Sequence, residues 1–131
     1  MAINYQDCWT YPKEKIDELI MKSITERKGR VTGKTGATLS EYRVVQKGRV
    51  VECHFVCTLS AAVGSSEKKI ADISGVDLPP TKIRFTCSTG TAAYNAKNAC
   101  YGILATDGEI AVLAGTTTDT IIIIDLVYTV D

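Results

Sequence analysis

The side chains best suited to chemistry lie between positions 52 and 57. Glu52 and His54 stand two residues apart in a stretch that alternates polar and apolar residues, so both would face the same side of a strand. Such a pair could act as an acid–base couple or as half of a metal site, but a single histidine on a polar strand face more often meets solvent or an interface. Cys53 and Cys57 would project from the opposite face, whereas structural zinc sites take their ligands from tight turns. We therefore predict no metal site here and no catalytic histidine.

Other patterns typical of enzymes are incomplete. Gly33-Lys34-Thr35 is similar to the end of a phosphate-binding loop, but the full motif requires a glycine where Lys28 stands. The sequence G-x-S-x-G of serine hydrolases does not occur. Most acidic residues from Asp72 onward lie in turn-like contexts, in which aspartate has a structural role. We expect a protein that is not an enzyme and needs no cofactor, and a pair of acids at the spacing of a glycosidase stays open as an alternative.

A polar stretch with one aromatic residue is the best candidate for ligand binding. Its segment is rich in Thr, Ala, Gly and Asn and is expected to form a loop near the end of a sheet. An aromatic ring can stack on a sugar, while amides and an ammonium group can hydrogen-bond to its hydroxyls. The candidate saccharide-binding residues are Tyr94, Asn95, Lys97 and Asn98. An ordinary polar loop is the alternative interpretation.

The composition limits the class of protein. The chain has 131 residues with 15 basic and 15 acidic side chains, so we expect one domain with an appendage and no general attraction to nucleic acid or anionic membrane. No apolar run is long enough to cross a bilayer, and the first residues lack the basic and apolar regions of a signal peptide. The chain has five cysteines. Cys53 and Cys57 would lie about 13 Å apart along a strand, which is too far for a disulfide between them. We predict buried, reduced cysteines in a chain that folds in a cytosol.

Residues 1–36 are expected to form an N-terminal segment with a short helix and a linker. Pro12 suits the first turn of a helix, and Gly29 suits its end. Such a helix would be too short to be stable alone in water, so its narrow apolar stripe must pack against something. Either it folds back on the sheet, or copies of it pair as a short coiled coil, which we favour. The expected oligomer contacts on this helix are Ile16, Leu19, Ile20 and Ile24.

Residues 37–131 are expected to form an antiparallel all-β head domain, a β-sandwich of the jelly-roll kind. The strongest signal is the stretch from Arg49 to Val63, whose apolar residues from Val51 to Val63 share one parity and predict a sheet with one buried face. A preceding strand would reach it through a two-residue turn at Lys47-Gly48. Short strands separated by turns are typical of a sandwich.

A second hairpin is expected around Asp107-Gly108. These two residues favour a type I′ turn, because both tolerate a positive φ. Pairing outward from that turn predicts one buried face. The predicted pairs are Ala105 with Ile110, Ile103 with Val112 and Tyr101 with Ala114.

The last strand, from Thr120 to Val130, contains four consecutive isoleucines. A run that is apolar on both parities fits a strand covered on both faces. One face would pack in the sandwich and the other against a neighbouring subunit, with Ile122 and Ile124 as the expected contacts. A closed homo-oligomer, most simply a trimer, would keep such a strand from aggregating.

Three short motifs stand in a suggestive order. They are the strand from Tyr42 to Val51, the segment Leu78-Pro79-Pro80, and the turn from Asp107 to Ile110. Trp9 and Tyr11-Pro12 precede them in the N-terminal segment. In this order the motifs resemble the C-terminal head module of bacteriophage and prophage tail fibres or baseplate receptor-binding proteins. The resemblance covers residues 37–131. The resemblance implies a trimeric head on a short stem that binds host cell-wall saccharide, carried in the virion tail and folded in the bacterial host cytoplasm.

These observations lead to one expected function and two alternatives. We predict a phage or prophage tail or baseplate protein that recognises saccharide on the host surface and contacts other tail or baseplate proteins. The first alternative is a virion accessory or scaffolding protein that binds only other tail proteins. The second is a small carbohydrate-active domain. Neither nucleic-acid binding nor membrane insertion is expected.

Overall fold

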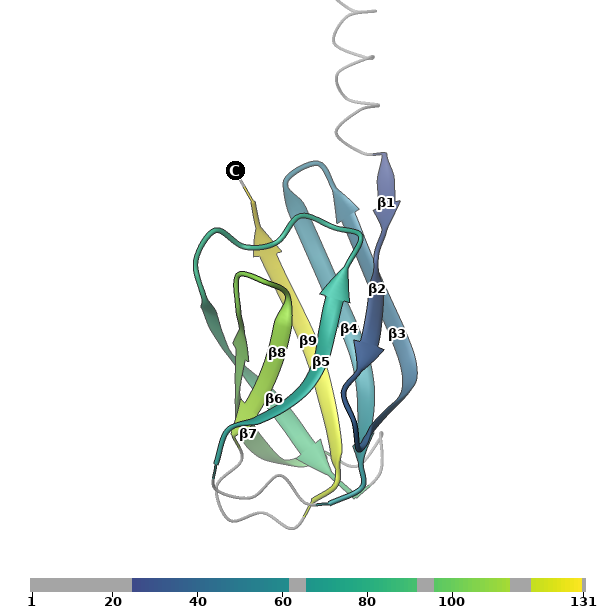
Figure 1. The fold of residues 1–131 in the computed structure, drawn as a ribbon, viewed down its shortest axis with the longest axis vertical. Helices are drawn as coiled ribbons and strands as arrows, with labels where there is room; N and C mark the ends of the chain where they lie inside the picture. The colour runs from purple at the N-terminus through teal and green to yellow at the C-terminus, as the bar shows by residue number, and fades with distance from the viewer. Residues whose placement is uncertain (1–24, 62–65, 92–95, 114–118, 131) are drawn as a thin grey trace, which may run out of the picture.

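The computed structural model describes residues 25–61, 66–91, 96–113 and 119–130, and the helix predicted to start at Pro12 lies outside these ranges as far as residue 24. Within them the chain is an antiparallel all-β fold (Figure 1). This confirms the predicted antiparallel all-β class. The strands are β1 Glu26–Lys28, β2 Arg30–Gly33, β3 Ala37–Lys47, β4 Val50–Leu59, β5 Lys68–Ser74, β6 Ile83–Gly90, β7 Ala96–Leu104, β8 Glu109–Leu113 and β9 Ile121–Thr129.

All of these strands belong to one sheet that nearly closes on itself, as a barrel does. Their order is β1-β3-β4-β9-β6-β7-β8-β5-β2, and neighbouring strands run antiparallel. The two edge strands, β1 and β2, follow each other in sequence with Gly29 alone between them. One continuous segment therefore pairs first with β3 and then with β5, and it joins the two ends of the sheet. The sequence predicts the end of the helix and the linker in this segment, and that prediction is wrong, because residues 26–33 pair with β3 and β5 in the sheet.

Gly29 makes this closure possible. Its amide donates a hydrogen bond to the Val44 carbonyl oxygen at 2.8 Å. A Cβ atom at this position would lie 2.7 Å from the Ser74 carbonyl oxygen, closer than real Cβ contacts allow. A residue without a side chain is required here because the backbones of the crossing segments almost touch.

The core fills the inside of the curved sheet and consists of alternate strand residues. On β4 the buried side chains are Val51, Cys53, Phe55, Cys57 and Leu59. Glu52 and His54 lie between them and are partly exposed. The predicted alternation is thus confirmed as far as the end of β4, whereas Ala61, predicted to continue the buried face, is exposed. Burial of large apolar side chains stabilises the fold by about 1.5–3 kcal/mol each.

The predicted hairpin between β3 and β4 is confirmed, with its turn one residue later than predicted. Lys47 pairs with Val50, so Gly48 and Arg49 are the central residues of the turn. Gly48 has a φ of 58°, and among the described residues only glycines have a positive φ. Glycine at the first central position is typical of a type II′ turn, whose twist matches that of the two strands.

The hairpin between β7 and β8 is present, but its predicted register is wrong. The observed pairs are Leu104 with Ile110, Ile103 with Ala111, Gly102 with Val112 and Tyr101 with Leu113. The Ala105 amide donates to the Glu109 carbonyl oxygen at 2.9 Å, so Ala105 and Glu109 close the hairpin with three turn residues between them. Asp107 lacks the positive φ that a type I′ turn needs, while Gly108 has a φ of 92°, as in a three-residue turn with a glycine bulge. The extra turn residue reverses the faces of β7, and Tyr101, predicted to be buried, is exposed.

Strand β9 lies in the middle of the sheet between β4 and β6, and this position corrects the predicted role of its isoleucines. Ile122 and Ile124 are each 0% exposed in the single chain. They are core residues, so the prediction that they contact another copy is wrong. That prediction assumed an edge strand with apolar residues to spare, whereas the curved sheet itself covers the inner face of β9. Ile121 and Ile123, on the outer face, are half-buried.

A hydrogen-bonded cluster at one end of the sheet ties the segment after β5 to the β3–β4 hairpin. The Asp77 carboxylate accepts a hydrogen bond from Gln46 at 2.9 Å and one from Arg27 at 2.6 Å. These two bonds hold the pKa of Asp77 below its ordinary value. The Tyr128 hydroxyl donates to the Asp77 carbonyl oxygen at 2.7 Å, and burial raises the pKa of Tyr128 to about 12.

Candidate functional site

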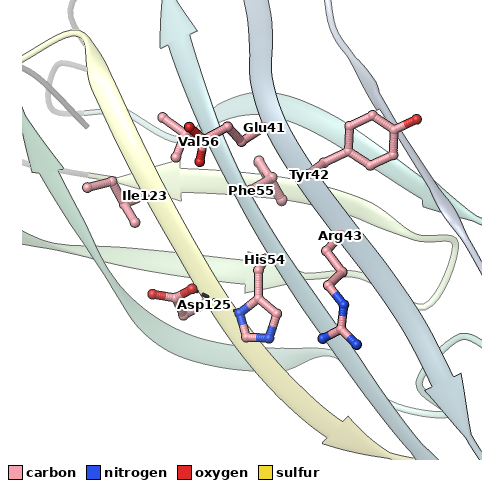
Figure 2. Close-up of a pocket in the computed structure, with 8 residues that line it drawn as sticks. All are labelled: Glu41, Tyr42, Arg43, His54, Phe55, Val56, Ile123 and Asp125. Carbon is pink, nitrogen blue, oxygen red and sulfur yellow. Dashed lines mark hydrogen bonds and ion pairs between the residues drawn. The ribbon is translucent and has the colours of Figure 1, made fainter. Parts of the chain in front are cut away.

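A shallow hollow of about 390 Å³ lies on the outer face of the sheet where β3, β4 and β9 run side by side (Figure 2). Its lining residues are Glu41, Tyr42, Arg43, His54, Phe55, Val56, Ile123 and Asp125. We call this feature the outer hollow. Figure 2 shows that its side chains come from all three strands.

Strand register sets the arrangement of these side chains. Arg43 pairs with His54, and His54 pairs with Asp125, so the three side chains form a row across β3, β4 and β9. A second row next to it consists of Glu41, Val56 and Ile123. Directly paired residues point to the same face and lie close enough to interact. The outer hollow thus places a charged and polar row beside a more apolar one, as Figure 2 shows.

His54 and Asp125 form the central contact of the polar row. The His54 Nδ1 atom lies 2.9 Å from Asp125 Oδ1, and the two side chains are 36% and 72% exposed. The contact is an ion pair only when the imidazole is protonated; in the neutral form Nδ1–H donates a hydrogen bond to the carboxylate. In either state the carboxylate orients the ring. The sequence-based expectation of a histidine that faces solvent or an interface agrees with this exposure.

Arg43 is held at the other end of the row by two carboxylates. Its guanidinium lies 3.2 Å from the Glu52 carboxylate and 3.9 Å from that of Glu26. Because the Arg43 side chain is 54% exposed, these ion pairs orient it more than they stabilise the fold. A guanidinium held in this way can still donate hydrogen bonds to a ligand through its remaining N–H groups.

Tyr42 carries an exposed aromatic ring beside the outer hollow, and its parity and its pairing with Phe55 direct the ring away from the face that carries Arg43. It is 53% exposed, although its strand partner Phe55 is buried. It also lines a second hollow of about 480 Å³, together with Glu26, Lys28, Gly29, Arg43, Val44 and Val45. In Figure 2 the ring points away from the polar row. Tyr42 therefore presents an aromatic face to solvent between two concave surfaces.

The residues predicted to bind saccharide are only partly described. Tyr94 and Asn95 lie outside the described residues. Lys97 belongs to β7, but its side chain is also outside the described part of the structure. Asn98 donates a hydrogen bond to the Asp119 carboxylate at 2.6 Å. Thr89, which is fully buried, donates to the same carboxylate oxygen at 3.0 Å. Asn98 thus connects β7 to the segment before β9 and does not line the outer hollow.

Sequence reasoning missed Tyr42, Arg43 and Asp125 as members of a site. In the sequence, Tyr42 and Arg43 stand out only as part of a strand motif. Asp125 carried a usable signal, because it is the one charged residue within the apolar run of the last strand. A charge at that place marks the solvent-facing parity of the strand. Its meeting with His54 depends on the β4–β9 register, which no local pattern specifies.

Lys34 forms ion pairs with two carboxylates. It is the lysine of the Gly-Lys-Thr sequence that is similar to a phosphate-binding loop. Its Nζ atom lies 2.9 Å from Asp72 and 3.2 Å from Glu109. Hydrogen bonds to Asp72 and then to Glu109 raise the pKa of Lys34. Glu109 also pairs with Lys69 at 3.2 Å, and this bond contributes most to the lowered pKa of Glu109. The arrangement links β5 and β8 to the residue after β2 and is structural.

Within the described ranges, no group of three or more His, Cys, Asp or Glu side chains is arranged to hold a metal ion. In the same part of the chain no helix has the length and apolar character needed to cross a membrane.

Comparison with protein-family models and with curated protein sequences gave no match. Comparison with solved structures found a shared fold. The chain is similar to the crystal structure of the receptor binding protein (gp15) of Listeria phage PSA, with a TM-score of 0.66. The match covers 97% of this chain and 78% of that one at 15% sequence identity. At this identity the likeness establishes a shared fold alone. In its fold, the chain thus agrees with the resemblance to phage receptor-binding modules seen in the sequence.

Proposed function

We propose that this chain is a tail or baseplate protein of a bacteriophage or prophage and that it recognises saccharide on the surface of the host cell. The observation that carries the proposal is the fold shared, over 97% of the chain, with a protein described as a phage receptor binding protein. The motifs from Tyr42 to Val51 and from Asp107 to Ile110 supported the same class independently. The proposed location is the virion tail, after folding in the host cytoplasm.

The outer hollow has the chemistry that a saccharide site needs. Tyr42 offers an exposed ring beside the hollow, directed away from the polar row, on which a further unit of a bound saccharide chain can stack. Arg43 donates hydrogen bonds, Asp125 accepts them, and His54 can do either, so the polar row can meet several hydroxyl groups. Val56 and Ile123 supply apolar contacts beside it. Concave surfaces with a few convergent polar groups are the usual form of a ligand site.

The proposed protein is a homo-oligomer, most simply a trimer of these antiparallel all-β heads. Two features support this assembly. The sequence predicts an apolar stripe from Ile16 to Ile24, and the described part exposes Val50 and Val127, which are 40% and 56% accessible. Both valines lie on the outer face at one end of the β4–β9 ladder, where another protein surface could cover them. The same two valines favour the second candidate function, a virion accessory protein that binds only other tail proteins.

Binding to host polysaccharide tests the proposal. Purified cell-wall and capsular polysaccharides from a panel of bacteria, immobilised as an array, should capture the wild-type chain reproducibly from at least one source. Tyr42→Ala should weaken that capture about tenfold, as expected for one lost aromatic stack. Tyr101→Ala is the matched control, because Tyr101 is also an exposed tyrosine but lies on β7.

The outcomes separate the candidates. Loss of capture for Tyr42→Ala with retention for Tyr101→Ala supports saccharide binding at the outer hollow. Absence of capture from every source, combined with retention of the chain by tail proteins, would favour the accessory role. Release of new reducing ends from a captured polysaccharide would instead identify a carbohydrate-active enzyme and contradict the proposed non-enzymatic role.

A further inference from the structure

Two of the four described cysteines face each other across a strand pair. Cys87 on β6 is paired directly with Cys100 on β7, and their sulfur atoms are in hydrogen-bond contact at 2.6 Å. Both residues are nearly buried, with 4% and 5% of their surface exposed. The other two, Cys53 and Cys57, are core residues on β4 and lie about 13 Å apart along that strand.

The strand register allows a covalent bond between Cys87 and Cys100. Residues directly opposite each other in an antiparallel pair have Cα atoms about 4.5–5.5 Å apart. A disulfide needs Cα atoms about 4.4–6.8 Å apart, so the bond can form without a shift of either strand. The ladder continues regularly on both sides of the pair, from Thr86 opposite Tyr101 to Ser88 opposite Ala99.

The pair also differs in reactivity from the other two described cysteines, Cys53 and Cys57. The hydrogen bond from the Cys87 thiol lowers the pKa of Cys100, because it stabilises the Cys100 thiolate. Burial raises the pKa of Cys53 to about 12 and that of Cys57 to about 11, which keeps both as unreactive thiols. Since the thiolate is the nucleophile, Cys100 is the one of these four described cysteines that reacts first.

We propose that Cys87 and Cys100 form a redox-sensitive thiol pair, reduced in the cytosol and oxidised by a hydroperoxide to an intrachain disulfide outside it. The Cys100 thiolate attacks one oxygen of hydrogen peroxide, becomes a sulfenic acid and releases hydroxide. The Cys87 thiol then loses its proton and attacks the Cys100 sulfur, which forms the S–S bond and releases a second hydroxide. The two cysteines lose two electrons and two protons, and the peroxide is reduced to two molecules of water.

The disulfide would strengthen the β6–β7 hairpin next to its contact with β9. The two cysteines are 13 positions apart, so the bond closes a short loop and restricts the unfolded chain. Ser88, the residue after Cys87, pairs with Ile123 of β9, which lines the outer hollow. The bond would therefore fix the β6–β7 pair next to this strand. A bond over a loop of this size should raise the midpoint of thermal unfolding by about 10 °C. This inference goes beyond the proposed function, because it holds whatever ligand the protein binds.

Peptide mapping tests the pair directly. The full chain is purified under reducing conditions, treated with hydrogen peroxide, blocked with N-ethylmaleimide in denaturant and digested with trypsin. Cleavage after Arg84 and Lys97 places Cys87 in the peptide 85–97 and Cys100 in the peptide 98–131. The expected product is these two peptides joined, with a loss of 2 Da that dithiothreitol reverses.

Variants identify the source of the effect. The Cys57→Ala control keeps the pair and should still give the joined peptides. Cys87→Ala should abolish the joined peptides and the thermal shift on oxidation. Absence of the joined peptides from the oxidised wild-type chain, or bridging of Cys53 or Cys57 in their place, would overturn the proposal. So would an unchanged unfolding midpoint in the joined form.

Discussion

Replacing Ile122 by alanine should destabilise the chain by about 4 kcal/mol, because the structure places this side chain wholly in the core. Ile122 is 0% exposed and packs in the main apolar cluster. The substitution removes three carbon atoms, which are worth about 2.4 kcal/mol by transfer from water. The cavity left behind adds about 1–2 kcal/mol, and the total lies within the range observed for such core substitutions.

Urea unfolding followed by far-ultraviolet circular dichroism measures this cost. For a chain of this size the midpoint should fall by about 2 M or more. Ile123→Ala is the matched control, since Ile123 is the next residue but lies half-buried on the outer face. Its cost should be about 1 kcal/mol or less. A small change for Ile122→Ala together with dissociation of an oligomer would refute the reasoning and restore Ile122 as an intersubunit contact.

Two further predictions follow from close contacts elsewhere in the sheet. Gly29→Ala should destabilise the fold by about 1–3 kcal/mol, because the new Cβ atom would meet the Ser74 carbonyl oxygen, and an unchanged urea midpoint would contradict closure by close approach. Asp77→Asn should lower the thermal midpoint at neutral pH. Bonds from Gln46 and Arg27 depress the pKa of Asp77 in the folded state, so the ionised carboxylate stabilises the fold above the ordinary value of about 3.9, and this stabilisation is lost as the pH falls through the depressed value. The difference from wild type should therefore shrink as the pH falls through that depressed value, and a difference that stays constant down to the acid limit of folding would contradict the assignment.

Much of the sheet could be predicted from local patterns. The alternation from Val51 to Leu59 specified the buried face of β4, because period-two burial is a property of a single strand. The turn glycine Gly48 specified the first hairpin. The register around Asp107 could not be read in the same way, since a two-residue and a three-residue turn use the same Asp-Gly pair and differ only in where pairing begins.

The remaining features depend on contacts between distant parts of the chain. Residues 26–33 have no alternating pattern, and they become strands because β3 and β5 offer free edges on either side of Gly29. The central position of β9, which buries Ile122, follows from its pairing with both β4 and β6. The outer hollow likewise requires three strands to meet in one register, so His54 could be noticed in the sequence but not matched with Asp125.

The most direct test of the proposed function is to locate the saccharide on the protein. An isotope-labelled chain titrated with oligosaccharides from the polysaccharide that captures it should show nuclear magnetic resonance shifts centred on Tyr42, Arg43, His54 and Asp125. Shifts confined to these residues and their strand neighbours would agree with binding in the outer hollow. Shifts confined to β7 and β8, or no shifts at saturating oligosaccharide, would contradict it.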